Sequence, residues 1–205
     1  MQLIRRIQRA LSKRWFTLLP TDRLIAMVGD QSSSRNSGIL IEALKENLAH
    51  QDGSLDRVDW SSANLDGALL SASRMRHAKF VSARLRGAYF GYSDLSAADL
   101  TLADLRETQF REANLNGARF DRANLRNANL ARAFLVCSSF VAADLSNANF
   151  WRADLRGANL TDAAMMNSNI ADAIFDETTT LPTGESWTDK VCWRDFTQDQ
   201  FPSRD

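Results

Sequence analysis

Cysteine and histidine are scarce in this chain of 205 residues, which contains only Cys137, Cys192, His50 and His77. Two cysteines are too few for a disulfide framework, and no spacing of Cys and His resembles a zinc site. Catalysis that depends on several histidines is disfavoured for the same reason. We therefore expect a reducing, cytoplasmic setting, with no metal and no cofactor.

Long apolar runs and a surplus of charge are also missing. No stretch reaches the roughly 18 apolar residues of a transmembrane helix. Arginines interrupt the apolar residues near the N-terminus, as in Leu3-Ile4-Arg5-Arg6-Ile7, which is unlike a signal peptide. The 25 basic and 25 acidic residues give a formal net charge of zero. A neutral chain has no overall electrostatic attraction to nucleic acid, so we do not expect nucleic-acid binding.

The motifs of common enzyme classes are absent as well. The phosphate-binding GxxxxGK[ST], the dinucleotide-binding GxGxxG, the HExxH of zinc proteases and the GxSxG of hydrolases do not occur. Several aspartates recur at regular spacing, namely Asp94, Asp99, Asp104, Asp144 and Asp154. Their spacing favours a structural role, because Asx side chains hydrogen-bond to the backbone of turns. We expect no catalytic residues and no enzymatic activity.

Internal repetition is the strongest pattern that the sequence does contain. Every fifth residue is large and apolar from Leu55 to Phe175, with no insertion, and the residue two positions earlier is usually Ala or Ser, with Gly53, Val58 and Thr108 as exceptions. A period of five matches neither an α-helix nor a β-strand. It predicts a coil whose backbone turns a corner every five residues. One large and one small residue of each unit then point inward, and three residues point outward.

The individual units follow the pattern A-[DN]-L-x-x, as in Ala63-Asn64-Leu65, Ala98-Asp99-Leu100, Ala123-Asn124-Leu125 and Ala153-Asp154-Leu155. This pattern resembles that of the pentapeptide-repeat family over roughly residues 53–177. The resemblance implies an all-β solenoid, a right-handed quadrilateral β-helix with four units in each coil. At that length per coil, the repeats would form about six coils.

The central residues themselves support an even number of sides. Those whose numbers end in 5 are Leu or Met from Leu55 to Met165, whereas most of those ending in 0, from Trp60 to Phe150, are aromatic. A four-sided coil keeps this alternation, because opposite sides share a class of residue. A three-sided coil would mix the two classes on every side, so four sides fit better.

We divide the chain into an N-terminal helical segment (1–52), the repeat solenoid (53–177) and a C-terminal capping segment (178–205). Short helices are predicted at residues 2–19 and at about 39–48. The first is basic and amphipathic, so it predicts either a cap on the solenoid or peripheral contact with a membrane surface.

The sequence after Phe175 leaves the repeat pattern. Thr178–Gly184, followed by Trp187, resembles the turn and aromatic plug that end many pentapeptide-repeat solenoids. Trp187, Trp193, Phe196 and Phe201 offer enough apolar area either to cover an open end or to form a homodimer contact through the terminal segments. We favour the C-terminal cap and keep the dimer as the alternative.

Arginines also repeat at the spacing of a four-sided coil. Arg86, Arg106 and Arg126 recur at every fourth repeat unit and would stack on one side as a ladder. Like charges about 5 Å apart repel each other unless neighbours or a ligand compensate them. Glu107 and Asp104 can do so, which favours a balanced, solvated surface, with an anion or partner site as the alternative.

Two groups of outward apolar residues interrupt the polar surface. The first contains Leu69, Tyr89 and Tyr92, and the second contains Phe134, Val136 and Trp151, together with Val141. Clustered aromatic residues on a polar rod predict an interface. The alternative is that the terminal segments fold over these residues.

The combined pattern favours a non-enzymatic interaction or scaffold module that presents a rigid rod to an unidentified protein partner. The family resemblance also implies an alternative, a DNA mimic that binds a topoisomerase such as gyrase. Such a mimic needs a strongly acidic, duplex-like surface. The neutral repeat region, with its arginine ladder, therefore favours the interaction module. A membrane-surface protein attached through residues 2–19 is the third hypothesis.

Overall fold

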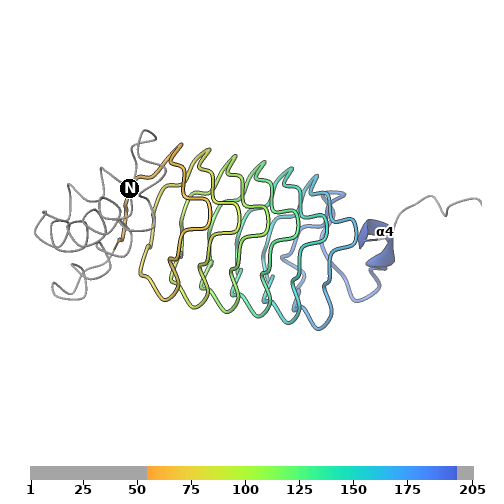
Figure 1. The fold of residues 1–205 in the computed structure, drawn as a ribbon. Helices are drawn as coiled ribbons and strands as arrows, with labels where there is room; N and C mark the ends of the chain where they lie inside the picture. The colour runs from red at the N-terminus through yellow and green to blue at the C-terminus, as the bar shows by residue number, and fades with distance from the viewer. Residues whose placement is uncertain (1–54, 198–205) are drawn as a thin grey trace, which may run out of the picture.

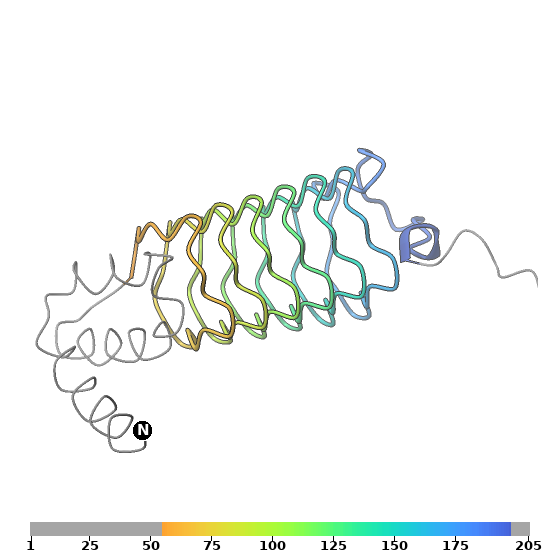
Figure 2. The same cartoon turned by 45° about the horizontal axis from the view of Figure 1, so that its top comes forward.

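The computed structural model describes residues 55–197, and the repeats among them stack into a rod of coils (Figure 1). Parallel β-bridges join residues twenty positions apart, from Asp59 paired with Lys79 to Asp154 paired with Ile174. Since the backbone turns every five residues, this spacing gives four sides. Figure 2 shows the same stack from a tilted view. The predicted four-sided β-solenoid is confirmed.

Tight turns form the corners of the coil. The carbonyl of nearly every central residue accepts a hydrogen bond from the amide three residues later, as Trp60 does from Ala63 at 3.1 Å. The residue before the small residue has a positive φ, for example 60° at Ser62 and 60° at Tyr92. This arrangement matches a type II turn. A left-handed conformation costs a non-glycine residue roughly 1 kcal/mol, so the bonds between coils must offset that strain at most corners.

Three backbone hydrogen bonds on each side join one coil to the next. On one side, Leu65 N–H donates to Arg84 O at 2.7 Å, Gly67 N–H to Arg86 O at 2.9 Å and Arg84 N–H to Ala63 O at 2.9 Å. The same pattern recurs along the rod. Each coil therefore depends on its immediate neighbours, and the stability of the solenoid is close to one-dimensional.

We name the four sides A to D by their inward central residues. Side A carries Trp60, Phe80, Leu100, Phe120, Phe140 and Leu160; side B carries Leu65, Leu85, Leu105, Leu125, Leu145 and Met165; side C carries Leu70, Phe90, Phe110, Leu130, Phe150 and Ile170; side D carries Leu55, Met75, Leu95, Leu115, Leu135, Leu155 and Phe175. All of these residues are buried except Ile170 and Phe175, which are half-buried at the C-terminal end.

A continuous column of aromatic rings fills the core between the opposite sides A and C. Successive ring centroids lie 5.2 Å apart for Phe90 and Phe110, 6.1 Å for Phe110 and Phe120, and 4.8 Å for Phe120 and Phe140. Side A has Leu100 where side C has Phe110, and side C has Leu130 where side A has Phe120. At these two levels a leucine on one side is matched by a ring on the other, whereas Phe80 and Phe90, and Phe140 and Phe150, pack ring against ring, so the core stays filled.

Asn and Asp side chains support the corners, as the sequence predicted. The Oδ1 atom of Asn124 accepts the backbone N–H of Arg126 at 3.2 Å, and that of Asp154 accepts the N–H of Arg156 at 3.3 Å. The Arg156 guanidinium also donates to both Asp154 oxygens, at 2.9 and 2.6 Å. These hydrogen bonds hold the pKa of Asp154 below its usual value.

The chain changes course after Phe175. Thr180 pairs in parallel with Asn159 and then antiparallel with Ser186, and the Trp193 ring lies 4.5 Å from that of Phe175. The helix α4, Arg194–Thr197, follows and is the only helix among residues 55–197. Residues 55–197 contain no helix that is long and apolar enough to cross a membrane.

Residues 178–197 thus lie at one end of the stack, and their role as a cap stays a prediction, as do the three segment boundaries. The predicted helices at 2–19 and 39–48 lie outside the described residues.

The aromatic column predicts that removing one ring destabilises the whole solenoid. Phe120→Ala should lower the free energy of unfolding by about 3–5 kcal/mol, because it leaves a cavity between two neighbouring rings. Phe134→Ala is the matched control: this side chain is 52% exposed, so its loss should cost about 0.5 kcal/mol or less. Urea denaturation followed by circular dichroism measures both variants. Equal losses would contradict this packing.

The corner at Asp154 predicts a specific dependence of stability on pH. Asp154→Asn should preserve the turn, because Asn occupies the same position at Asn114 and Asn124, but it removes the charged pair with Arg156. Ionised Asp154 stabilises the fold above its unfolded pKa of about 3.9, and this contribution is lost as the pH falls through the lower folded pKa. Between about pH 6 and pH 2, the wild type should lose about 1 kcal/mol more stability than the variant. Urea titrations across this range test the difference, and parallel curves would disprove it.

Candidate interaction surface

Side C brings the first predicted apolar group together. Leu69 and Tyr89 are bridged neighbours on this side, with 62% and 48% of their surfaces exposed. Tyr92 follows at the corner between sides C and D, which we call the C–D corner, and it is 64% exposed. Leu69 and Tyr89 are therefore adjacent on two neighbouring coils, and Tyr92 follows on the coil of Tyr89.

The second predicted group is divided between corners. Phe134 lies on side D directly after the C–D corner and is exposed, and the half-buried Trp151 lies on the same corner one coil further along. Val136 is half-buried at the far end of side D, and Val141 is half-buried beyond side A. The C–D corner therefore brings Phe134 and Trp151 together, with Tyr92 further along the same corner, whereas Val136 and Val141 point elsewhere.

Sequence reasoning missed three other exposed apolar residues. Leu102, Met166 and Ile174 are 52%, 44% and 50% exposed. Their outward positions in the five-residue frame could have identified them. Leu102 and Met166 lie on other corners, whereas Ile174 belongs to the same column as Phe134, with Asp154 between them.

The predicted arginine ladder, which lies at the corner between sides B and C, is neutralised by carboxylates. Arg86 pairs with Glu107 at 2.7 Å, Arg106 with Asp104 at 2.6 Å and Arg126 with Asp144 at 3.2 Å. The hydrogen bonds from Arg106 lower the pKa of Asp104. This geometry matches the balanced, solvated surface expected from the sequence, while a role for the ladder as a partner site stays a prediction.

Burial and hydrogen bonding oppose each other at Asp144. Its partial burial pushes the pKa up, but hydrogen bonds from Ser146 and from the Arg126 guanidinium outweigh that effect and lower the pKa. The carboxylate therefore stays ionised and keeps its pair with Arg126 at neutral pH.

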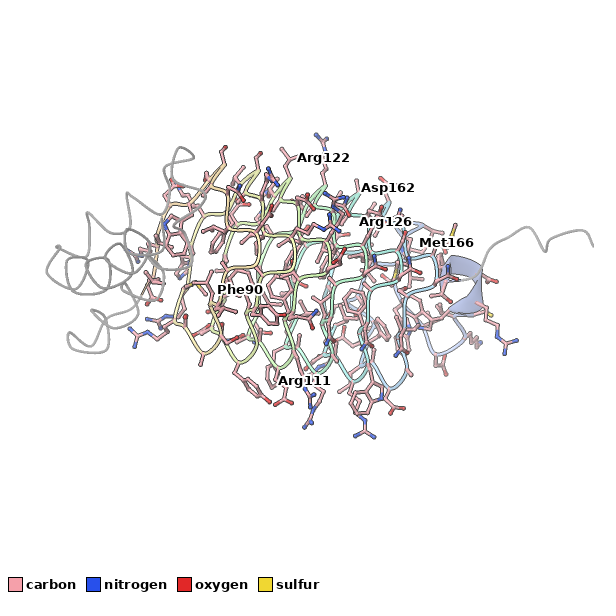
Figure 3. All side chains as sticks on the ribbon, viewed as in Figure 1. Phe90, Arg111, Arg122, Arg126, Asp162 and Met166 are labelled. Carbon is pink, nitrogen blue, oxygen red and sulfur yellow. The ribbon has the colours of Figure 1, made fainter. Side chains whose placement is uncertain are left out.

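Arginine outnumbers carboxylate at the middle of the C–D corner. Glu112 interacts with both Arg111, at 3.3 Å, and Arg132, at 3.4 Å, so one carboxylate serves two guanidinium groups. Figure 3 shows Arg111 projecting outward from the rod, whereas Phe90 lies inside it. This part of the corner therefore has a surplus positive charge next to Phe134.

One further arginine lies against the aromatic group itself. The Arg152 guanidinium carbon is 4.6 Å from the centroid of the Trp151 ring, a cation–π contact, and Arg152 also pairs with Asp172 at 3.2 Å. Aromatic and guanidinium groups are thus combined on one corner.

The outward column on side C is free of charge along its whole length. It consists of Leu69, Tyr89, Gln109, Asn129, Asn149 and Asn169. Its amides bond to one another, at 3.1 Å from Asn129 to Gln109 and 3.0 Å from Asn169 to Asn149. The Asn129 oxygen also accepts the Ala131 amide at 3.1 Å. Because these groups already satisfy one another, covering the column costs less desolvation than covering a charged side.

The surface offers little for metal chemistry. Within residues 55–197, no group of three or more His, Cys, Asp or Glu side chains is arranged to hold a metal ion. Cys137 and Cys192 are exposed free thiols.

Comparison with known proteins identifies the repeat. The family model described as pentapeptide repeats matches eight copies within residues 54–179. Among solved structures, a pentapeptide repeat protein from the Arabidopsis thaliana thylakoid lumen is 32% identical, with 54% of this chain and 66% of that chain covered and a TM-score of 0.38.

Two further solved structures are of similar proteins whose biological roles are described. HetL from the cyanobacterium Nostoc sp. strain PCC 7120, involved in heterocyst differentiation regulation, is 30% identical, with 64% of this chain and 67% of that chain covered and a TM-score of 0.28. QnrB1, a plasmid-mediated fluoroquinolone resistance protein, is 18% identical, with 58% and 67% covered and a TM-score of 0.38.

The alignments span about two thirds of each of these three chains. No match was found among curated proteins. The family match, however, covers more than half of this chain, and it coincides with the region in which residues twenty apart are paired. The chain therefore belongs to the pentapeptide-repeat family, whose fold is the right-handed quadrilateral β-helix.

Proposed function

We propose that this protein is a non-enzymatic interaction or scaffold module that binds a protein partner through side C and the C–D corner. One observation carries the proposal: Tyr92 and Phe134 are more than half exposed on the corner where Arg152 lies over Trp151. Tyr, Trp and Arg are the side chains most enriched at the energetic centres of protein interfaces.

The dimensions of this surface suit a protein partner. The column from Leu69 to Asn149 crosses five bridged positions, which at a spacing of about 4.8 Å makes it about 20 Å long. A typical interface takes roughly 800 Å² from each partner, so a partner would use the adjoining corner as well as this column. Side C lacks outward charges in this column, so its desolvation cost is low.

The rigidity of the solenoid also favours binding. Each coil is held by backbone hydrogen bonds to its neighbours, so the spacing between Tyr92 and Trp151 is fixed before a partner arrives. Binding to a rigid surface avoids part of the entropy loss that a flexible surface would incur. This property fits a scaffold, and the absence of enzyme motifs from the sequence agrees with it.

The charge distribution disfavours the DNA-mimic alternative. Duplex DNA carries a dense row of negative charge, one for roughly every 1.7 Å of its axis. A mimic needs a comparable acidic row. On side B, guanidinium groups neutralise the carboxylates of Asp104, Glu107 and Asp144. The C–D corner is basic at Arg111 and Arg132, which is the wrong sign for a mimic.

Two matched double variants test the proposed surface. In affinity purification from the source organism, Phe134→Ala/Trp151→Ala should reduce recovery of the specific partner at least tenfold, because truncating an interface centre typically costs about 1–2 kcal/mol or more. The control Leu102→Ala/Val141→Ala removes apolar groups from the corner between sides A and B, away from side C, and should leave recovery unchanged. Both variants should retain the wild-type melting profile.

An unchanged partner set for Phe134→Ala/Trp151→Ala would exclude this corner as the binding surface. A gyrase supercoiling assay addresses the rival function. Inhibition by the wild-type protein at stoichiometric amounts would favour the topoisomerase-binding alternative over the scaffold.

A further inference from the structure

The outward amides in the middle of side C form a ladder that occupies their oxygen atoms. The Oδ1 atom of Asn129 accepts hydrogen bonds from the Ala131 N–H at 3.1 Å and from Asn149 Nδ2 at 3.4 Å. The Oδ1 atom of Asn149 accepts them from the Trp151 N–H at 3.1 Å and from Asn169 Nδ2 at 3.0 Å. An amide oxygen has two lone pairs, so neither oxygen has a lone pair left for a partner.

The nitrogen atoms of the same amides keep a free donor. Each Asn nitrogen from Asn129 to Asn169 donates one of its two hydrogens to the preceding amide of the ladder. The other hydrogen has no acceptor among residues 55–197. Side C therefore presents a row of N–H donors about 4.8 Å apart, and the oxygens beside them at Asn129 and Asn149 are already used.

A molecule that covers this side must offer hydrogen-bond acceptors to these donors. A donor that is buried without a partner costs free energy, and neither an apolar group nor another donor offsets that cost. An ionised carboxylate only accepts hydrogen bonds, whereas hydroxyl and amide groups bring donors of their own. The charges beside the ladder show which kind of acceptor fits best.

Two guanidinium groups at the C–D corner share a single carboxylate oxygen. Arg111 Nε lies 3.3 Å and Arg132 Nη1 lies 3.4 Å from Glu112 Oε1. The Glu112 side chain is 24% exposed, whereas those of Arg111 and Arg132 are 54% and 49% exposed. No other carboxylate of residues 55–197 lies within 4.0 Å of either guanidinium. Since each guanidinium has five N–H donors, most of these donors face solvent.

The other arginines around side C have no such surplus. Arg86, Arg106 and Arg126, at the corner between sides B and C, each pair with a different carboxylate, at 2.7, 2.6 and 3.2 Å. At the C–D corner, Arg152 is matched by Asp172 at 3.2 Å. The unmatched positive charge is therefore confined to the two arginines that share one carboxylate.

A surplus of this size fits a carboxylate better than a phosphate backbone. A carboxylate binds a guanidinium through two parallel hydrogen bonds, so a single one would match the free charge at this corner. A nucleic-acid strand in a duplex carries one negative charge for about every 3.4 Å of its length. Most of its phosphates would find no cation along the uncharged column of side C. The occupant that these contacts favour is an acidic segment of a protein.

We propose that the partner segment bound at side C is acidic. Its carboxylates accept hydrogen bonds from Arg111 and Arg132, and its remaining acceptors meet the free N–H groups of Asn129 and Asn149. This inference rests on the proposed binding function, because it specifies the chemistry of the partner at the same surface.

An NMR titration of the full-length, isotope-labelled protein with a peptide of six glutamates tests this chemistry. At low ionic strength, where surface charges are least screened, the peptide should shift the side-chain amide signals of Asn129 and Asn149 in a saturable manner. It should also shift the Nε–H signals of Arg111 and Arg132. A peptide of six lysines is the matched control and should leave all four side chains unchanged. The readout is residue-specific, so peptide bound elsewhere on the chain does not contribute to it.

Two variants at the shared carboxylate should change the affinity for hexaglutamate in opposite directions. Arg111→Gln/Arg132→Gln should weaken the binding measured at Asn129 by about fivefold or more, because both guanidinium groups are lost. Glu112→Gln should strengthen it by about twofold, because it removes the carboxylate that competes with the peptide. The second variant keeps the test decisive if the first is destabilised.

A control on the far side of the rod corrects for the change in total charge. Arg119→Gln/Arg122→Gln removes the same two charges from side A and the corner that follows it. Figure 3 shows Arg122 and Arg111 projecting from opposite sides of the rod. Binding at Asn129 should be unchanged in this control.

The possible outcomes separate this inference from the proposed function. Shifts at Asn129 and Asn149 that respond to all three variants as stated would support an acidic partner. No shift with hexaglutamate, an equal shift with hexalysine, or no gain in Glu112→Gln would overturn the inference. Shifts of these amides by a hexathymidylate oligonucleotide at tenfold lower concentration would also overturn it, because nucleic acid would then be the occupant.

The affinity purification with Phe134→Ala/Trp151→Ala tests the proposed function separately. A partner whose recovery depends on those two residues, together with no response to hexaglutamate, would overturn only the acidic nature of the partner.

Discussion

The architecture depends on filling a narrow core. The central side chains, one in every five residues, point into it, and only two of them face each other between opposite sides. A ring on side A meets a ring or a Leu on side C, and the pairings of Leu100 with Phe110 and of Phe120 with Leu130 keep the volume matched. The small residue beside each corner leaves room for this packing. A single insertion would turn every later side chain out of its place, which explains why the frame holds without a break from Leu55 to Phe175.

This constraint leaves only the outer positions free to vary for function. The inward residues and the corner amides are committed to packing and to the bonds between coils. The outward columns differ sharply: side B carries Arg106 with Asp104 and Arg126 with Asp144, whereas the side C column is uncharged. A partner that approaches side C has fewer ionic groups to desolvate, and it meets the aromatic and arginine side chains at its border.

The periodic sequence predicted the fold and much of the surface, because each position in a unit has one fixed orientation. The exposure of Leu69, Tyr89 and Phe134 follows from that frame alone. The half-buried state of Trp151 does not, because it depends on a neighbouring side chain, that of Arg152, which lies over its ring. The sequence could not predict which carboxylate each arginine pairs with either. A long side chain can bond within its own unit, as Arg156 does, or to the next coil, as Arg86 does. The path after Phe175 has no period, so the sequence could not place it.

A solenoid built from identical bonds contains nothing that tells it where to stop, so residues outside the repeat must end it. The last coil leaves the same donors and acceptors as every coil before it, and their exposure favours further pairing. Side A is closed by Thr180 and Pro182, and Thr197 accepts a bond at the corner that follows side B; none of these three residues follows the pentapeptide frame.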